Sequence, residues 1–221
     1  MPQLDAVIFD MDGTLVDTLL MTIGAIEKHA PACGLGPVTR EALLQAIGLC
    51  NRDFYLALYP DSSEAQRQKI DALDEEGELE IGRTRGEKIL FAGVPVMLRQ
   101  LRGAGIRLLL ASTGTEYHVK GCLSIAGILP FFEKIRCNAP DKTEMTAELL
   151  EGVDSSRVVF IGDSAKDIQA ARGNRLAVYG AGFGYAHARD SFDRIFSTPR
   201  TLTEALLRDE DTAETSWMTS S

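Results

Sequence analysis

The sequence predicts an α/β protein in which a doubly wound parallel sheet carries an inserted helical region after its first strand. Short apolar runs rich in β-branched residues, typical of buried parallel strands, occur at residues 6–9, 106–111 and 158–161. Helical patterns separate these runs. Residues 17–90 contain no convincing strand, and this interval is much longer than a simple crossover between parallel strands needs.

The elements follow in chain order from these patterns. After the first strand, the inserted region shows helical patterns at residues 18–30, 40–47, 52–58 and 63–90. Residues 94–104 then place apolar side chains three and four positions apart, which predicts an amphipathic helix before the second strand. Weaker strand patterns lie near Ile135 and at residues 176–179. We expect three parts: a core from residues 1–16 and 92–208, a helical domain at 17–91, and a disordered tail at 209–221.

The charge balance narrows the classes of partner. The chain has 23 Lys and Arg residues against 32 Asp and Glu residues, a formal net charge of −9, and no basic run. These features argue against nucleic acid and against an anionic membrane surface, and they favour a small metabolite or a metal ion. They indicate no oligomeric state.

The cysteines and the apolar segments indicate the compartment. Cys33, Cys50, Cys122 and Cys137 lie far apart and have no zinc-site spacing, so we expect free thiols in a reducing compartment. No stretch of about 18 apolar residues occurs, and the first ten residues do not resemble a signal peptide. The expectation is a soluble, cytoplasmic protein.

Two aspartates follow the first strand, in the stretch VIFDMDGTLVDT from Val7 to Thr18. Ligands of parallel α/β sheets bind beyond the carboxyl ends of the strands, where Asp10 and Asp12 are expected. Two carboxylates there repel each other unless a cation neutralises one of them or a proton occupies the other. The pair therefore favours a magnesium site combined with an acid–base function.

The other strand ends supply matching groups. The second strand is followed by Ser112 and Thr113, and Lys142 lies at the start of a later helix. The strand at residues 158–161 is followed by Asp163, and Asp167 lies one helical turn further on. Carboxylates, a hydroxyl and an ammonium group are thus expected at one rim of the sheet.

At these residues the chain resembles the haloacid dehalogenase superfamily of phosphohydrolases, which has four dispersed motifs in this order. Asp10-Met11-Asp12-Gly13-Thr14 is similar to the first motif, Ser112 to the second, Lys142 to the third, and Gly162-Asp163 with Asp167 to the fourth. The resemblance implies a Rossmann-like core, with the helical insertion forming an all-α type 1 cap. The resemblance spans residues 7–172.

The resemblance also implies roles for these residues. Asp10 would attack the phosphoryl group and form an aspartyl-phosphate, while Asp12 would act as general acid and then base, which requires a proton on Asp12 at working pH. Mg²⁺ would be bound by the carboxylates of Asp10 and Asp163 and the backbone carbonyl of Asp12. An acid at position 12 favours phosphoryl transfer over carbon–halogen cleavage.

The remaining roles concern the phosphoryl oxygens. Ser112 and Lys142 would hold them, with Thr113 as the competing hydroxyl, and Gly13 would leave space for the phosphate. Asp167 would orient Lys142 or a metal-bound water. The family commonly has Lys-Pro where this chain has Lys142-Thr143, so a surface lysine is the alternative at that position.

Other patterns have simpler interpretations. Residues 177–185 (AVYGAGFGY) lack the third glycine of a dinucleotide fingerprint and are interpreted as a flexible rim loop near the active site. The three histidines, His29, His118 and His187, share no metal spacing and are interpreted as surface or second-shell residues. Arg52 could reach the distal part of a substrate or could simply be solvated. The run DEEGELEIGRTRGEK is interpreted as a solvated face or linker.

Together these points predict a Mg²⁺-dependent phosphatase for a small phosphorylated metabolite, with a mobile cap that closes over the site. A phosphomutase of the β-phosphoglucomutase kind would share all four motifs. A non-catalytic regulatory or binding module is the third alternative, which the presence of Asp10, Asp12 and Asp163 argues against.

Overall fold

The computed structural model describes residues 4–46, 49, 51–139, 141–185 and 191–208. Its centre is one parallel sheet with the strand order β3-β2-β1-β4-β5-β6. The strands are β1 (Ala6–Phe9), β2 (Arg107–Ala111), β3 (Lys134–Arg136), β4 (Val158–Gly162), β5 (Ala177–Ala181) and β6 (Arg194–Phe196). The predicted doubly wound α/β class is confirmed, because the order runs outward in both directions from β1.

Strand register brings the polar strand ends together. Phe9, the last residue of β1, pairs with Leu110 of β2 on one side and with Ile161 of β4 on the other. The segments that follow these three strands therefore leave the sheet at the same edge. Asp10, Ser112 and Asp163 lie in those segments, as expected from parallel strands.

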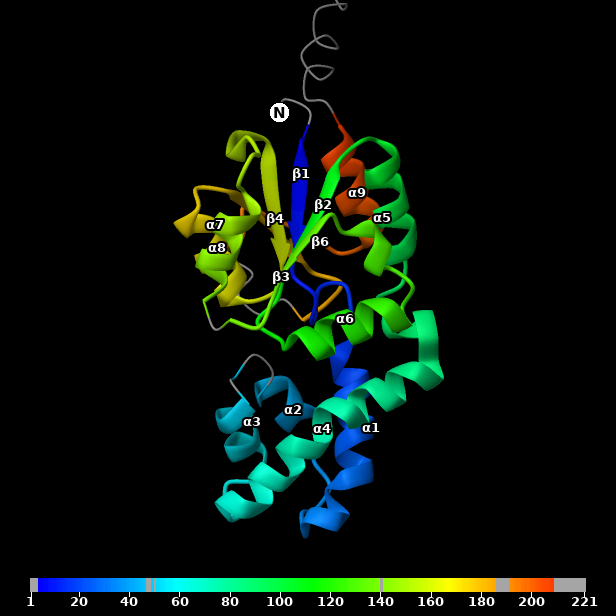
Figure 1. The fold of residues 1–221 in the computed structure, drawn as a ribbon, viewed down its shortest axis with the longest axis vertical. Helices are drawn as coiled ribbons and strands as arrows, with labels where there is room; N and C mark the ends of the chain where they lie inside the picture. The colour runs from blue at the N-terminus through cyan, green and yellow to red at the C-terminus, as the bar shows by residue number, and fades with distance from the viewer. Residues whose placement is uncertain (1–3, 47–48, 50, 140, 186–190, 209–221) are drawn as a thin grey trace, which may run out of the picture.

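Helices cover both faces of the sheet (Figure 1). Those of the core are α5 (Val94–Gly103), α6 (Glu116–Ile125), α7 (Lys142–Leu149), α8 (Ala165–Gly173) and α9 (Pro199–Leu207). Phe9 packs in one apolar cluster with side chains of α5 and α9, whereas Ile8 packs in a second cluster with side chains of α7 and α8. Successive residues of β1 thus face opposite layers, so the whole strand is buried.

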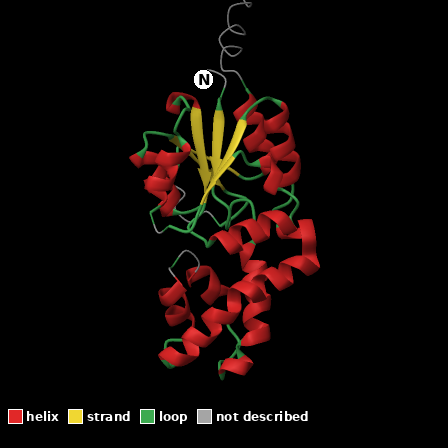
Figure 2. Cartoon of the chain, in the orientation of Figure 1, coloured by secondary structure: helices red, strands yellow, loops and turns green. Residues whose placement is uncertain are grey.

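Every element described between β1 and α5 is a helix, and loops join these helices (Figure 2). Its helices are α1 (Thr18–His29), α2 (Arg40–Ala46), α3 (Asn51–Leu58) and α4 (Glu64–Arg85), with short 3-10 turns at Pro31–Cys33 and Gly86–Ile89. Helix α1 packs along α4, and this region has an apolar cluster of its own around Ile26, Tyr55 and Ile70. Figure 1 places these helices beyond the carboxyl edge of the sheet.

Helix α4 is shorter than the predicted pattern at residues 63–90. It begins at a capping box, in which Ser63 and Gln66 satisfy each other's backbone amides. It ends at Gly86, whose φ of 56° breaks the helical conformation. The 3-10 turn then leads the chain back toward the sheet.

Two connections join the helical region to the sheet, and they lie side by side. The amide of Asp17 donates to the carbonyl of Ile89 (2.8 Å), and the amide of Phe91 donates to the carbonyl of Leu15 (3.1 Å). Val16 and Leu90 accordingly form an antiparallel bridge. The chain leaves the core and returns to it at neighbouring points.

Other expectations have mixed outcomes. The sixth strand, β6, was not predicted. Cys33, Cys122 and Cys137 are free thiols, while Cys50 and the tail at 209–221 lie outside the described residues. Within the described part of the chain, no helix combines the length and the apolar character needed to cross a bilayer.

Candidate active site

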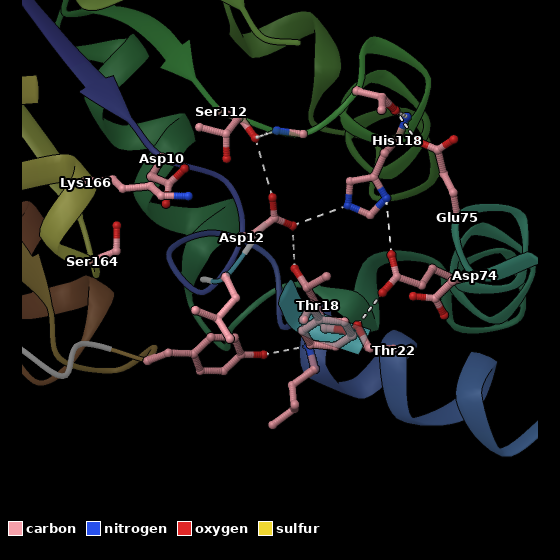
Figure 3. Close-up of a pocket in the computed structure, with 18 of the residues that line it drawn as sticks. Asp10, Asp12, Thr18, Thr22, Asp74, Glu75, Ser112, His118, Ser164 and Lys166 are labelled. Carbon is pink, nitrogen blue, oxygen red and sulfur yellow. Dashed lines mark hydrogen bonds and ion pairs between the residues drawn. The ribbon is translucent and has the colours of Figure 1, made fainter. Parts of the chain in front are cut away.

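A cavity of about 750 Å³ lies between the carboxyl edge of the sheet and the helical region. Figure 3 shows the side chains that line it, with Asp12 near the centre, Ser112 and Lys166 on the core side, and Asp74 and Glu75 on the helical side. Six predicted site residues, from four separate chain segments, line this one space: Asp10, Asp12, Ser112, Thr113, Lys142 and Asp163.

Lys142 is buried between two carboxylates at the base of the cavity. Its Nζ donates to Oδ1 of Asp10 at 2.8 Å and to Oδ1 of Asp167 at 2.7 Å. The lysine is the first residue of α7, and Asp141 caps that helix by accepting from the amide of Thr143. Burial opposes the charge of Lys142, but Asp10 and Asp167 outweigh burial and raise the pKa of the ammonium group. Lys142 is therefore not a surface lysine.

Asp167 acts as the anchor of this group. Its Oδ2 accepts from the hydroxyl of Ser164 (2.7 Å) and from the amides of Ser164 (2.9 Å) and Asp163 (3.1 Å). Since Oδ1 holds Lys142, both oxygens of this fully buried carboxylate are engaged. Asp167 was predicted to orient either Lys142 or a metal-bound water, and the structure shows its contact with Lys142.

Asp163 follows β4 and faces the loop after β1. Its Oδ1 accepts from the hydroxyl of Thr14 at 3.0 Å. Gly13, with a φ of 76°, lies against the same carboxylate, because a Cβ at position 13 would come within 2.5 Å of Asp163 and 2.6 Å of Tyr185. The amide of Gly13 donates to the carbonyl of Val16 at 2.9 Å, so Gly13 provides space for its neighbours and its donor is already used.

Three buried carboxylates, Asp10, Asp163 and Asp167, lie together at this corner, and Lys142 binds two of them. Burial is the largest cause that raises the pKa of Asp10, followed by the charge of Asp167, and Lys142 offsets this only partly. Burial and the charge of Asp167 raise the pKa of Asp163 to about 7. One oxygen from each of Asp10, Asp163 and Asp167 lies within 4.8 Å of the others. Excess negative charge on close, hard oxygen atoms fits a divalent cation such as Mg²⁺.

Asp12 is held on the other side of the cavity floor. Its Oδ1 accepts from the hydroxyl of Thr18 (2.6 Å) and lies 3.3 Å from Nε2 of His118, and its Oδ2 is 3.5 Å from the hydroxyl of Ser112. Burial disfavours its charge, but the hydrogen bonds and charges of His118 and Thr18 outweigh burial and lower the pKa of Asp12.

The lowered pKa corrects one expectation. Asp12 was expected to keep its proton at working pH, yet its surroundings in the ligand-free protein favour the carboxylate. The physical reason is His118, which the sequence did not identify as a partner of Asp12. Burial lowers the pKa of the His118 imidazole, but its contacts with Asp12 and Cys122 and the charge of Glu78 outweigh burial and raise that pKa well above its usual value, which favours a proton on His118 beside Asp12.

The structure distinguishes the two candidate hydroxyls after β2. Ser112 is buried, approaches Asp12, and accepts from the amide of Gly114 at 3.1 Å. Thr113 lines the cavity but is exposed. The buried position of Ser112 follows from its place directly after the apolar strand.

His118 is the main site residue that sequence reasoning missed, although its second-shell interpretation agrees with its position. It lies in the first turn of α6, which is capped by Thr115. The imidazole spans from Asp12 to Glu78 of α4, with Nδ1 3.4 Å from Oε2 of Glu78. The available signal was its place in the first turn of the helix that follows β2. His29 ends α1 and is not among the lining residues, and His187 lies outside the described residues.

The acidic run of α4 was interpreted wrongly as a solvated face or linker. Asp74, Glu75 and Glu78 line the cavity, and Glu78 is buried, whereas Glu76 and Glu80 are exposed. The reason is helical periodicity: residues three and four apart share a face, and this face of α4 looks toward Asp12. Only the opposite face of the run is solvated.

Two further predictions concern the rim. Residues 177–181 form β5, so the rim loop is confined to the residues after it, and Tyr185 there lines the cavity. The amide of Tyr185 donates to the carbonyl of Gly13 (3.1 Å), and its hydroxyl accepts from the amide of Leu19 (2.8 Å) and donates to Asp17.

Arg52 is the second residue of α3, but its side chain is outside what the structure describes, so its role stays a prediction.

Comparisons with known proteins agree with this geometry. The family described as haloacid dehalogenase-like hydrolase matches residues 7–181. A phosphoglycolate phosphatase of Synechococcus elongatus is 26% identical over 92% of this chain and 97% of its own. An N-acetylmuramic acid 6-phosphate phosphatase of Pseudomonas aeruginosa is 29% identical over 93% and 96%. The structure of a haloacid dehalogenase-like hydrolase from Streptococcus pneumoniae, 18% identical, superposes with a TM-score of 0.76 over 93% of this chain and 99% of its own.

Proposed function

The chain belongs to the haloacid dehalogenase-like hydrolase family and is a phosphatase of that family, and from this premise we propose that it is Mg²⁺-dependent and acts through an aspartyl-phosphate. The observation that carries the proposal is the buried corner at the carboxyl edge of the sheet. There Lys142 donates hydrogen bonds to the carboxylates of both Asp10 and Asp167, and Asp12 and Asp163 line the same cavity.

Asp10 is the nucleophile of this scheme. A carboxylate oxygen of Asp10 bonds to phosphorus while the bond from phosphorus to the leaving alkoxide breaks. Lys142 orients the carboxylate through Oδ1, which turns a flexible side chain into a fixed one. Ser112, next to Asp12, is placed to hold a phosphoryl oxygen.

Asp12 moves the proton. It donates a proton to the leaving oxygen, then accepts one from the water that hydrolyses the aspartyl-phosphate. A phosphoryl dianion beside Asp12 opposes the ionisation of its carboxyl group and so favours proton uptake. His118, at 3.3 Å, is the adjacent donor from which the proton can come. Inorganic phosphate and the alcohol are the products, and Asp10 and Asp12 return to their starting states once Asp12 passes the proton taken from water back to His118.

The carboxylates of Asp10 and Asp163 and the backbone carbonyl of Asp12 would hold Mg²⁺. When bound, the ion supplies positive charge to the phosphoryl oxygens and to the crowded carboxylates. Support comes from the geometry of the corner, where one oxygen from each of Asp10, Asp163 and Asp167 lies within 4.8 Å of the others and Lys142 supplies one positive charge.

The substrate is proposed as a small phosphorylated metabolite, and the site of action as the cytoplasm, in keeping with the buried free thiols of Cys33 and Cys122. The relatives do not decide which metabolite, since those at 26% and 29% identity are named for different phosphate esters. The choice is expected to depend on the helical side of the cavity.

Phosphate release from a panel of phosphomonoesters, first with Mg²⁺ and then with EDTA, tests the proposal. The panel includes p-nitrophenyl phosphate, phosphoglycolate and hexose phosphates. Metal-dependent release is the expected result. No release from any ester would contradict it, and conversion of β-glucose 1-phosphate to glucose 6-phosphate without net release of phosphate would show a phosphomutase instead.

A further inference from the structure

The helical side of the cavity is acidic. Helix α4 lines it with Asp71, Asp74, Glu75 and Glu78, and among the described side chains of the helical region that line the cavity none is basic. The two lysines that line it belong to the core. Because the phosphoryl group is held on the core side, the helical side receives the leaving alcohol.

Glu78 and then Asp74 lie progressively further from Asp12, the proposed general acid, on the helical side of the cavity. The imidazole of His118 reaches from Asp12 to Glu78, and Asp74 lies one helical turn before Glu78 on the same face of α4. Figure 3 shows Asp74 and Glu75 on α4 beyond His118 and Thr22, as seen from Asp12. A leaving group of hexose size would extend from Asp12 toward this wall.

Asp74 is the residue whose contacts point to a ligand. The hydroxyl of Tyr55 donates to its Oδ2, but its buried Oδ1 has no hydrogen-bond partner in the described part of the chain. A buried acceptor without a partner costs free energy, so it favours a ligand that supplies a donor. Burial, followed by the charge of Glu78, raises the pKa of Asp74, and a nearby positive charge would offset both effects.

Among the described residues, only uncharged groups donate hydrogen bonds to Asp74 and Glu75, although the charge of His118 also acts on Asp74. The hydrogen bonds that reach Asp74 and Glu75 from described residues come from the hydroxyls of Tyr55 and Thr115, which carry no charge. His118 faces Glu78, so the imidazolium compensates that carboxylate. The aromatic rings of Phe54 and Tyr55, 5.1 Å apart between centroids, also line the cavity, and aromatic faces attract cations.

We propose that this phosphatase selects phosphomonoesters whose leaving alcohol carries a protonated amine, with Asp74 and Glu75 as the recognising carboxylates. The proposal rests on the proposed function and adds the chemistry of its substrate. A carboxylate-bearing ester such as phosphoglycolate would meet like charges on this wall, whereas an ammonium group would donate to it.

Matched esters test the amine directly. The value of kcat/KM with Mg²⁺ is compared within two pairs, glucosamine 6-phosphate with glucose 6-phosphate and phosphoethanolamine with ethyl phosphate. At least one amine is expected to exceed its neutral partner by about tenfold or more. The pair that shows the preference tells whether the amine belongs to a sugar or to a short alcohol. N-acetylglucosamine 6-phosphate, which lacks the charge, should lose the advantage.

Variants locate the preference. Asp74→Asn should bring the ratio of amine to neutral ester close to one, and Glu75→Gln should lower it. Glu80→Gln, an exposed position on the same helix that pairs with Lys28, should keep the wild-type ratio. Because each comparison is a ratio within one variant, a general loss of activity does not imitate the effect.

The contrary outcomes are distinct. Active enzyme with equal rates on amine and neutral esters, or with phosphoglycolate as the best substrate, overturns the amine proposal and leaves the phosphatase proposal intact. If phosphoglycolate is the best substrate, the Arg52→Ala variant tests why: loss of phosphoglycolate hydrolysis in that variant would assign substrate selection to this basic residue. No release from any ester, p-nitrophenyl phosphate included, overturns the proposed function, and the amine proposal falls with it.

Discussion

The core side and the helical side of the cavity are both rich in carboxylates, but they hold them differently. On the core side Asp10 and Asp167 share a buried ammonium group. On the helical side Asp74 and Glu75 receive only hydroxyl donors from described residues. The difference indicates that the partners of a carboxylate determine its function. A carboxylate with a buried cationic partner is held in one position for catalysis, whereas a carboxylate without such a partner is suited to binding a cationic ligand.

The largest expected loss of activity comes from substitution of Asp10, which tests the catalytic function of the core side. Asp10→Asn should lower kcat by about three orders of magnitude or more, because an amide cannot act as the nucleophile. Steady-state phosphate release measures this. Asp5→Asn, just before the other end of β1, is the control and should keep its activity. Substantial turnover by Asp10→Asn would remove Asp10 from the mechanism.

Lys142 tests whether the paired side depends on its pairing. Lys142→Met should destabilise the protein by about 3 kcal/mol, since it leaves Asp10 and Asp167 buried without their cation. Urea unfolding with EDTA present measures this free energy. Lys120→Met, which removes an exposed partner of Glu116, should change stability little. Equal effects of the two substitutions would mean that the buried pairing is not needed for stability.

His118 lies between the two sides and joins them. His118→Asn should lower kcat for alkyl phosphates by about 10-fold or more, because it removes a support of Asp12. The loss should be smaller for p-nitrophenyl phosphate, whose leaving group needs little protonation. A purely structural role would lower both rates alike. His29→Asn is the matched control.

A further expected effect is on the dependence of stability on pH. Burial and Asp167 raise the pKa of Asp163 from 3.8 to about 7 in the folded protein, so the folded state binds a proton that the unfolded chain has lost in this window. Stability should therefore fall as pH rises from about 4 to 7, by at most about 1.4 kcal/mol per pH unit for one proton. Urea unfolding with EDTA at several pH values measures the slope.

Mg²⁺ should flatten this slope, because a cation beside Asp163 favours the charged form. Asp163→Asn, which cannot titrate, should flatten it without Mg²⁺. A slope that neither change affects would assign the pH dependence to groups elsewhere in the molecule.

The core side could be predicted from the sequence because one rule places it. Parallel strands end at the same edge, so recognising the strands was enough to bring Asp10, Ser112 and Asp163 together. The position of Lys142 could not be predicted by this rule alone, because a surface lysine was the alternative. Its contacts with Asp10 and Asp167 in the structure show that it is buried.

The helical side could not be predicted in this way. The burial of Glu78 and the position of Asp74 depend on how α4 packs against α1 and α6, which no local pattern of the acidic run encodes. His118 is similar, because its partner on α4 is 40 positions away in the sequence. Periodicity could show that Asp74 and Glu78 share a face, but not which way that face looks.

The double connection between core and helical region has a mechanical consequence. A single connecting strand could swivel about its own backbone bonds, but here two strands are tied by the bonds from Asp17 to Ile89 and from Phe91 to Leu15. We expect paired connections to resist torsion more than bending, so that a movement of the helical region would be a swing about the bridge of Val16 and Leu90. Each swing would return the acidic wall to the same alignment over Asp12.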